Sequence, residues 1–269
     1  MSLSQTDFSI QSENGRQTPW AIEFRDIHKV FDNNEHVLKG VNLNIQWGET
    51  VSLVGNSGTG KSILVKMLIG LLQPTQGSLV VAGQEVEGLN EMEWMPLRKR
   101  VSMVFQANAL FDSMTVYENI AFPLRQHLQM PEPEIKDRVA EVLEWVLLPG
   151  IEHQYPQELS GGMRKRVGVA RGIVTEPEIL LYDEPTAGLD PVSTTVVDEM
   201  IRRFQRERGV TSIVITHDLK SAMNVGDRVA LLNQGVVWAC GTPDELMNEQ
   251  DTFVRGFFEG YRLAMELLQ

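Results

Sequence analysis

Hydrophobic and polar positions along the chain follow two periods, one typical of strands and one typical of helices. Residues 21–24 and 41–45 alternate apolar and polar side chains, as half-buried strands do. Helical spacing follows in 61–72, which ends before Pro74, and again in 193–208. Strand–helix alternation of this kind predicts an α/β core. The other strand-like runs are residues 51–54, 77–82, 101–105, 179–182, 212–215 and 229–232.

The pattern changes between about residue 107 and residue 160, where no clear strand remains. Within this stretch, residues 134–148 predict a helix, because their apolar side chains recur at helical spacing. These side chains are Ile135, Val139, Val142, Leu143, Val146 and Leu147. We predict a helical subdomain over about 107–160, inserted into a main domain that covers residues 21–250. The polar residues 1–20 are interpreted as a disordered leader.

The last segment, residues 251–269, is predicted to be a helical tail. Its apolar side chains recur at helical spacing, at Phe253, Phe257, Tyr261, Met265 and Leu268. Two interpretations stay open. The tail is either a helix packed on its own domain or a segment that grips a second copy or an accessory subunit.

Composition and charge narrow the classes of function. The 269 residues carry a formal net charge of −12, which disfavours nucleic-acid binding because phosphates need Lys and Arg partners. The one cysteine, Cys240, excludes an intramolecular disulfide and fits a reducing compartment. No run reaches the roughly 18–20 apolar residues of a membrane span, and the first residues do not resemble a secretory signal. We expect a cytoplasmic chain that reaches a membrane only through a partner.

A glycine-rich loop lies between the strand at 51–54 and the helix that begins at Lys61. Its glycines let several backbone N–H groups point at phosphate oxygens, and the following helix start adds partial positive charge. Lys61 is expected at the β- and γ-phosphates of ATP, and the Ser62 hydroxyl at Mg²⁺. The alternative, a chance glycine-rich turn, fits the flanking strand and helix less well. The loop, which fits G-x-x-x-x-G-K-[ST], is Gly55, Asn56, Ser57, Gly58, Thr59, Gly60, Lys61 and Ser62.

Two adjacent acids follow the strand at 179–182. Ligands of a parallel sheet bind at the carboxyl ends of its strands, so Asp183 is expected beside the glycine loop, where it holds Mg²⁺ directly or through water. Glu184 is then placed to polarise the attacking water, a contribution of about 10²–10⁴-fold to the rate. A single acid could merely end a strand. Two acids followed by Pro185 favour an enzyme that hydrolyses ATP.

Further motifs resemble those of the ABC ATPase family. The run Leu159-Ser160-Gly161-Gly162-Met163 is similar to the family's LSGGQ signature and lies shortly before the acidic strand. Gln106 resembles the family's Q-loop glutamine, Asp190 its D-loop aspartate, His217 its switch histidine, and Phe31 the aromatic residue that stacks on adenine.

Each of these single positions has a simpler interpretation. Gln106 could be a surface glutamine, His217 a structural histidine and Phe31 a core residue. The joint order of the motifs over residues 21–250 favours the functional interpretation. By this resemblance Gln106 belongs to both the catalytic and the metal-binding residues, His217 to the catalytic residues, and Phe31 and Asp190 to those that bind the nucleotide.

The resemblance implies a fold and a mechanism. It implies a RecA-like P-loop core with an antiparallel β subdomain and a helical ABC subdomain. In this family ATP is sandwiched between the P-loop of one copy and the signature of another, so a second copy is an expected partner. Ser160, Gly161 and Gly162 then form a phosphate site at a helix start. ATP binding closes the pair and hydrolysis reopens it, which drives separate integral membrane subunits.

The residues after Gln106 resemble one particular group of ABC ATPases. Residues 109–119 and 123–125, with the LSGGM-type signature and Lys165-Arg166-Val167, are similar to the ATPases of bacterial Mla/Mce-type phospholipid transport systems. The expected place is the cytoplasmic face of the inner membrane. The expected partners are permease subunits, a small accessory subunit and a periplasmic lipid-binding Mce-type protein. Amino-acid importer ATPases share most of these features and remain an alternative.

Two function classes outside transport are weighed against this interpretation. A non-transport ABC ATPase of DNA repair or ribosomes usually carries a long coiled-coil insertion or two cassettes, and neither is evident in this sequence. A P-loop kinase or GTPase has no signature motif.

Met163 departs from the usual signature glutamine, and a thioether cannot replace the amide's hydrogen bonds. We expect hydrolysis to persist because Leu159, Ser160 and both glycines are intact.

Overall fold

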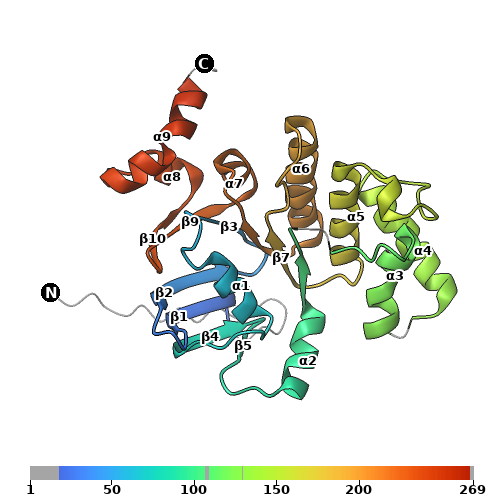
Figure 1. Cartoon of the computed structure of the whole chain (residues 1–269), viewed down its shortest axis with the longest axis horizontal. Helices are drawn as coiled ribbons and strands as arrows, with labels where there is room; N and C mark the ends of the chain where they lie inside the picture. The colour runs from blue at the N-terminus through green and yellow to red at the C-terminus, as the bar shows by residue number, and fades with distance from the viewer. Residues whose placement is uncertain (1–17, 107–108, 129, 267–269) are drawn as a thin grey trace.

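The computed structural model describes residues 18–106, 109–128 and 130–266 (Figure 1). The strands are β1 (Trp20–Val30), β2 (His36–Gln46), β3 (Thr50–Val54), β4 (Gln76–Val81), β5 (Gln84–Glu85), β6 (Val101–Val104), β7 (Ile179–Asp183), β8 (Thr211–Ile215), β9 (Arg228–Asn233) and β10 (Val236–Gly241). The helices are α1 (Lys61–Leu68), α2 (Glu91–Arg100), α3 (Val116–His127), α4 (Glu132–Trp145), η1 (Pro156–Glu158), α5 (Gly161–Ile173), α6 (Pro191–Arg208), α7 (Leu219–Val225), α8 (Pro243–Met247) and α9 (Thr252–Glu266).

The described strands form two sheets. The larger has the order β10-β9-β3-β8-β7-β6, and its strands are parallel except for the antiparallel pair β9 and β10. The smaller has the order β2-β1-β4-β5 and is antiparallel throughout. One hydrophobic core joins the two sheets through α1 and includes Ile27, Leu53 and Leu68. This arrangement is the predicted α/β core with an antiparallel β subdomain.

The segment predicted as a helical subdomain contains α3, α4 and η1, and Figure 1 shows α3 and α4 grouped with α5 at one side of the chain. Its buried residues, such as Leu124 and Val142, share one core with Val104 of β6, Tyr182 of β7 and Phe204 of α6. Packing against the sheet therefore holds the helical segment close to the carboxyl ends of β6 and β7. Its boundaries at about 107 and 160 remain a prediction.

Two of the expected boundaries differ in the structure. The helix expected over 61–72 ends at Leu68, because the backbone turns at Gly70 with a φ of +71°. A Cβ at Gly70 would lie 2.5 Å from Cδ2 of Trp94, so the turn also requires a glycine for packing. The leader expected over 1–20 falls outside the described residues up to residue 17, and β1 already begins at Trp20.

The C-terminal helix α9 packs on its own domain through a different stripe from the one expected. Val254 and Phe258 are fully buried against α7, α8 and β9, with Phe257 and Tyr261 half-buried beside them. Phe253, placed in the expected stripe, is exposed and stacks edge-on against Trp238 of β10. The side chains of Met265 and Leu268, also placed in the expected stripe, lie outside what the structure describes. No described helix has the length and apolar character of a membrane span.

Candidate active site

Strands β3, β6, β7 and β8 end at the same edge of the large sheet. In the register of the sheet Val104 lies opposite Tyr182, and Ile215 lies opposite both Asp183 and Leu53. The segments that leave these strands therefore emerge side by side. They carry the glycine loop after β3, Gln106 after β6, Glu184 after β7 and His217 after β8. Ligands of parallel sheets bind outside this edge.

The loop of residues 55–62 has a backbone that requires glycine at two positions. Gly55 and Gly60 have φ values of +148° and +106°. A Cβ at Gly55 would lie 2.2 Å from the Leu232 carbonyl oxygen, and one at Gly60 would lie 2.5 Å from Cδ2 of Leu38. The loop thus presses against β9 on one side and β2 on the other. Its curled backbone ends at Lys61, where α1 begins, and this is the architecture of a phosphate cradle.

Lys61 places its ammonium inside this loop. Nζ donates to the carbonyl oxygens of Gly55 at 2.7 Å and Asn56 at 2.9 Å. Burial lowers the pKa of Lys61, and the negative charges of Glu184 and Asp183 act against that shift. Ser62 stands beside Lys61, exposed in the first turn of α1. A cation, a hydroxyl and a glycine backbone at one helix start fit the phosphates of a nucleotide.

The two acids after β7 have different surroundings. Burial raises the pKa of Asp183, and the charge of Glu184 adds to that increase. Glu184 has a φ of +49°, and its backbone N–H donates to the Ile215 carbonyl at 2.9 Å. Its Oε2 lies 2.8 Å from Nδ1 of His217. A carboxylate only accepts hydrogen bonds, so Nδ1 is the donor in this contact.

The Glu184–His217 pair lies where the site meets the solvent, as the exposed fractions of the two side chains show. The Glu184 side chain is 14% exposed and that of His217 is 72% exposed. Glu184 is thus shielded on the side of the sheet, and His217 stands on the side of the solvent. The sequence predicted both residues separately, and the structure brings them into direct contact.

The signature helix α5 begins at an open N-terminus. Ser160 is its N-cap, and its Oγ accepts a hydrogen bond from the Met163 N–H at 3.2 Å. No atom comes within 4 Å of a Cβ built on Gly161. A Cβ on Gly162 would lie 3.1 Å from Oγ of Ser193. Figure 1 shows α5 among the helices at one side and α1 over the strands at the centre, apart from each other in this view.

Asp190 lies next to the signature through Ser193. It caps α6 by accepting hydrogen bonds from the N–H groups of Val192 and Ser193, each at 3.0 Å, and from Ser193 Oγ at 2.6 Å. These hydrogen bonds, with Ser193 Oγ first among them, lower the pKa of Asp190. The same Ser193 Oγ would lie 3.1 Å from a Cβ on Gly162, so Asp190 and the start of α5 are neighbours.

Phe31 and Gln106 are less tightly defined than the other predicted residues. Phe31 follows β1 and is half-buried, so it is not a core residue. The Lys29 ammonium lies 5.4 Å from the centre of its ring. The side chain of Gln106 is exposed, while its backbone carbonyl accepts a hydrogen bond from Nζ of Lys165. Their roles as A-loop and Q-loop residues, and their contacts with a nucleotide, remain predictions.

Lys165 is the residue that sequence reasoning missed. It lies in α5 with a relative exposure of 5%, and its Nζ donates both to the Gln106 carbonyl after β6 and to the Glu184 carbonyl after β7, the latter at 3.2 Å. A signal was available in the sequence. Lys165 precedes the buried Val169 by one helical turn, and a cation in line with apolar positions is unusual for a surface helix.

Changing Met163 to glutamine tests whether the signature tolerates its thioether. The Met163 side chain is half-buried against the core of the helical segment, whereas its backbone N–H makes the cap with Ser160. We expect Met163→Gln to keep ATP turnover within about twofold or to raise it, because the cap does not depend on the side chain. Steady-state phosphate release measures this. A clear loss of turnover in a folded variant would mean that the thioether itself is required.

Comparison with known proteins agrees with this geometry. The chain matches the ABC transporter family over residues 38–187. It is 40% identical to the probable ribonucleotide transport ATP-binding protein mkl of Mycobacterium leprae, over 91% of this chain and 70% of that protein. It is 39% identical to the methionine import ATP-binding protein MetN of Corynebacterium glutamicum, over 92% and 69%. It is 40% identical to the protein TRIGALACTOSYLDIACYLGLYCEROL 3 of Arabidopsis thaliana, over 89% and 73%.

Solved structures agree with the fold. One is the dimeric ATP-binding cassette MJ0796 in a post-hydrolysis state with ADP and Pi (TM-score 0.76, 31% identity, 82% of this chain and 98% of that chain). Another is cbiO1 of Clostridium perfringens, part of an ABC transporter complex (TM-score 0.81, 29% identity, 94% and 100%). The fold and the site define a P-loop ATPase of the cassette type, which confirms the predicted fold class. The chain belongs to the ABC transporter family and is an ATPase of that family.

Proposed function

We propose that this ATPase drives the movement of phospholipids between the inner and outer membranes of a bacterium, in a system of the Mla/Mce type. The observation that carries this proposal is the LSGGM-type signature together with the segment after Gln106. The relative from Arabidopsis supports it, because that protein is named for a glycerolipid and matches 89% of this chain. The second candidate is import of an amino acid, which the similar identity to the methionine importer MetN favours.

The roles proposed for the site follow from its geometry. The glycine loop and Lys61 hold the phosphates, and Phe31 stacks on the adenine. The Ser62 hydroxyl, the Asp183 carboxylate and Gln106 would hold Mg²⁺, because Mg²⁺ prefers oxygen ligands and is usually bound by one or two carboxylates plus substrate phosphates. Mg²⁺ neutralises charge that develops on the phosphates.

Glu184 is proposed to orient and polarise the attacking water. Its Oε2 is held by Nδ1 of His217, and its backbone is fixed by the Ile215 carbonyl, so the carboxylate has a defined direction. His217 then keeps Glu184 in place and faces the γ-phosphate from the side of the solvent. Ser160, Gly161, Gly162 and Asp190 are proposed to bind the ATP of a second copy across a shared interface, because Ser160, Gly161 and Asp190 are exposed in a single chain and Gly162 lies half-buried beside them.

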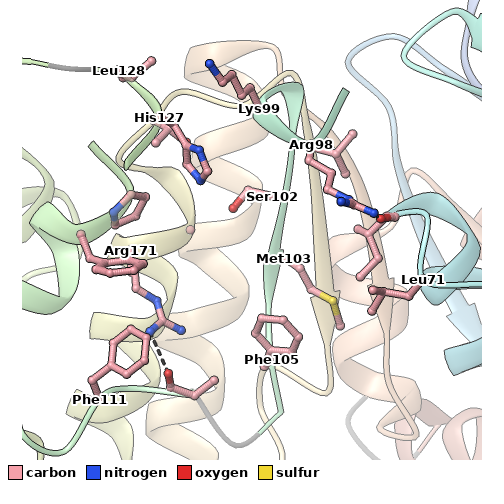
Figure 2. A pocket seen from close by; sticks show the side chains of 17 residues that line it. Leu71, Arg98, Lys99, Ser102, Met103, Phe105, Phe111, His127, Leu128 and Arg171 are labelled. Carbon is pink, nitrogen blue, oxygen red and sulfur yellow. Dashed lines mark hydrogen bonds between the residues drawn. The ribbon is translucent and has the colours of Figure 1, made fainter. Parts of the chain in front are cut away.

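A groove beside Gln106 supports a membrane partner. It has a volume of about 650 Å³, and Figure 2 shows Arg171, Phe111 and His127 on its α3–α5 side and Arg98 and Leu71 on the opposite side. Phe105, Phe111 and Leu71 are exposed within it. Apolar side chains gathered in a surface groove are typical of an interaction site. We assign this groove to an integral permease subunit, and we propose that the chain works on the cytoplasmic face of the inner membrane. A small accessory subunit and a periplasmic Mce-type protein complete the proposed assembly.

Reconstitution of the tagged complex tests the proposed cargo. The complex purified from membranes is placed in vesicles that contain a fluorescent phospholipid, and lipid loss is followed with ATP. We expect lipid movement that depends on ATP, and a rate of ATP hydrolysis that does not change when methionine is added. The same complex with Glu184→Gln is the matched control and should move no lipid. Stimulation by methionine alone would instead establish an importer, and a chain that associates with DNA or ribosomes and no membrane protein would overturn the transport role.

A further inference from the structure

Lys165 occupies an unusual place at the carboxyl edge of the large sheet. Among the charged side chains that the structure describes, Asp198 is the other one buried to the same 5% exposure. Burial of a lysine costs free energy unless its ammonium has hydrogen-bond partners. Its two hydrogen-bond acceptors are the backbone carbonyls of Gln106 and Glu184, which belong to two different loops.

These loops carry two of the residues proposed to act on the reacting groups. Strands β6 and β7 pair up to Val104 and Tyr182, and Gln106 and Glu184 lie beyond this last pair. Past the end of the ladder, the Lys165 ammonium links the two backbones. Glu184 is thereby held on both sides, since its N–H donates to Ile215 of β8 and its carbonyl accepts from α5. Such fixing is needed for a residue with a φ of +49°.

A second cation of α5 holds the same loop further along. Nη1 of Arg171 donates to the Ala109 carbonyl at 2.8 Å, and its guanidinium lies 5.9 Å from the centre of the Phe111 ring. Figure 2 shows Arg171 and Phe111 side by side in this position. Helix α5 therefore binds backbone carbonyls on both sides of residues 107–108. Gln106, Ala109 and the signature at Ser160 are thus tied to a single helix.

The charge of Lys165 also matters to the site. Burial lowers its pKa, and the negative charges of Glu184 and Asp183 oppose this shift. Hydrogen bonds from a charged donor are stronger than neutral ones, so a protonated Lys165 is a firm link between the two carbonyls. Methionine in its place would keep a long unbranched side chain without any donor.

We propose that Lys165 is a positioning residue that holds the backbones of Gln106 and Glu184 at a fixed separation and couples both to the signature helix. The proposal rests on the site roles given above and adds to them a link inside one chain. When a second copy engages the exposed start of α5, the same rigid helix carries Gln106 and Glu184 with it. A displacement of about 1 Å at a reacting group can cost about 10²-fold in rate, so the link affects catalysis more than binding.

Three variants of α5 test the proposal by separating kcat from KM. Lys165→Met is expected to lower kcat by about 10–100-fold and to leave KM for ATP within about twofold. Lys165→Arg, which keeps charge and donors, is expected to recover most of the loss. The matched control is Arg166→Met, because Arg166 donates to the carbonyls of Val146 and Leu147 at the end of α4 instead, and it should stay near wild-type turnover.

Hydrogen exchange gives a readout that does not depend on activity. Peptides covering residues 104–111 should exchange faster in Lys165→Met than in the wild type, and peptides of α4 should not. If Lys165→Met does not fold, Lys165→Gln, which keeps two donors without charge, is measured in the same way and should lie between the wild type and a complete loss of kcat. Wild-type kcat and wild-type exchange in the folded variant would overturn the proposal, as would a raised KM that arginine does not restore. A wrong assignment of the ATPase site would give a different result from a wrong role for Lys165, because the wild-type chain itself would then not hydrolyse ATP.

Discussion

Replacing Glu184 with glutamine is expected to lower ATP turnover by about 10²–10⁴-fold while ATP binding is retained. The amide has the same shape as the carboxylate but cannot take up a proton. The backbone hydrogen bond from Glu184 to Ile215 does not involve the side chain, so the loop keeps its position. Lys61 and the glycine loop are unchanged, so the phosphates remain bound. Steady-state phosphate release and binding of a fluorescent ATP analogue measure the two effects separately.

A control for this experiment lies on α6. Glu207 pairs with Arg203 one helical turn away on an exposed surface, and Glu207→Gln removes only that pair, worth about 0.3–0.5 kcal/mol. Its turnover should match the wild type. Turnover of Glu184→Gln near the wild-type rate would remove Glu184 from the proposed mechanism and leave the polarisation of water unassigned.

Replacing Ser160 with arginine is expected to abolish hydrolysis without preventing ATP binding by a single chain. The N-terminus of α5 is open at Gly161, and a large side chain at Ser160 would fill the space in front of its N–H groups. The bound nucleotide of the same chain is held by Lys61 and the glycine loop, which the substitution leaves intact. The loss of the N-cap costs about 1 kcal/mol, too little to unfold a domain of this size.

The matched variant is Ser160→Thr, which keeps a capping hydroxyl and should keep most of the turnover. ATP binding is followed by fluorescence and folding by thermal unfolding, so that a loss of turnover cannot be mistaken for a loss of structure. Undiminished hydrolysis in Ser160→Arg would mean that the P-loop acts without a signature, as in a kinase or GTPase.

Most of the site could be predicted because it lies at the ends of strands. Glycine after β3 and acids after β7 are local features, and a parallel sheet brings such ends to one edge, where Lys61 and Asp183 now lie near each other in the fold. The contact between Glu184 and His217 was not predictable from spacing. Each residue was expected at the edge, but the hydrogen bond between them joins loops that follow two different strands.

Contacts between elements distant in the sequence account for the rest. Lys165 reaches Gln106 and Glu184 across two loops, and no periodicity in the sequence encodes that meeting. The tail shows the same limit. Its apolar residues predicted a helix, but three neighbouring elements decide which face is buried, so Val254 and Phe258 point inward and Phe253 outward. The spacing of apolar residues thus predicted the helices and strands, whereas tertiary packing determines which side chains contact each other.

We propose that two copies of this chain share each ATP, and the association state of the Glu184→Gln variant tests this most directly. Analytical ultracentrifugation is run with ATP and Mg²⁺, with ADP and Mg²⁺, and without nucleotide. We expect a dimer with ATP and a monomer in the other two conditions, and we expect that adding Ser160→Arg to the same chain abolishes the dimer. A monomer under all conditions, or an ATP-dependent dimer that survives Ser160→Arg, would contradict the shared site.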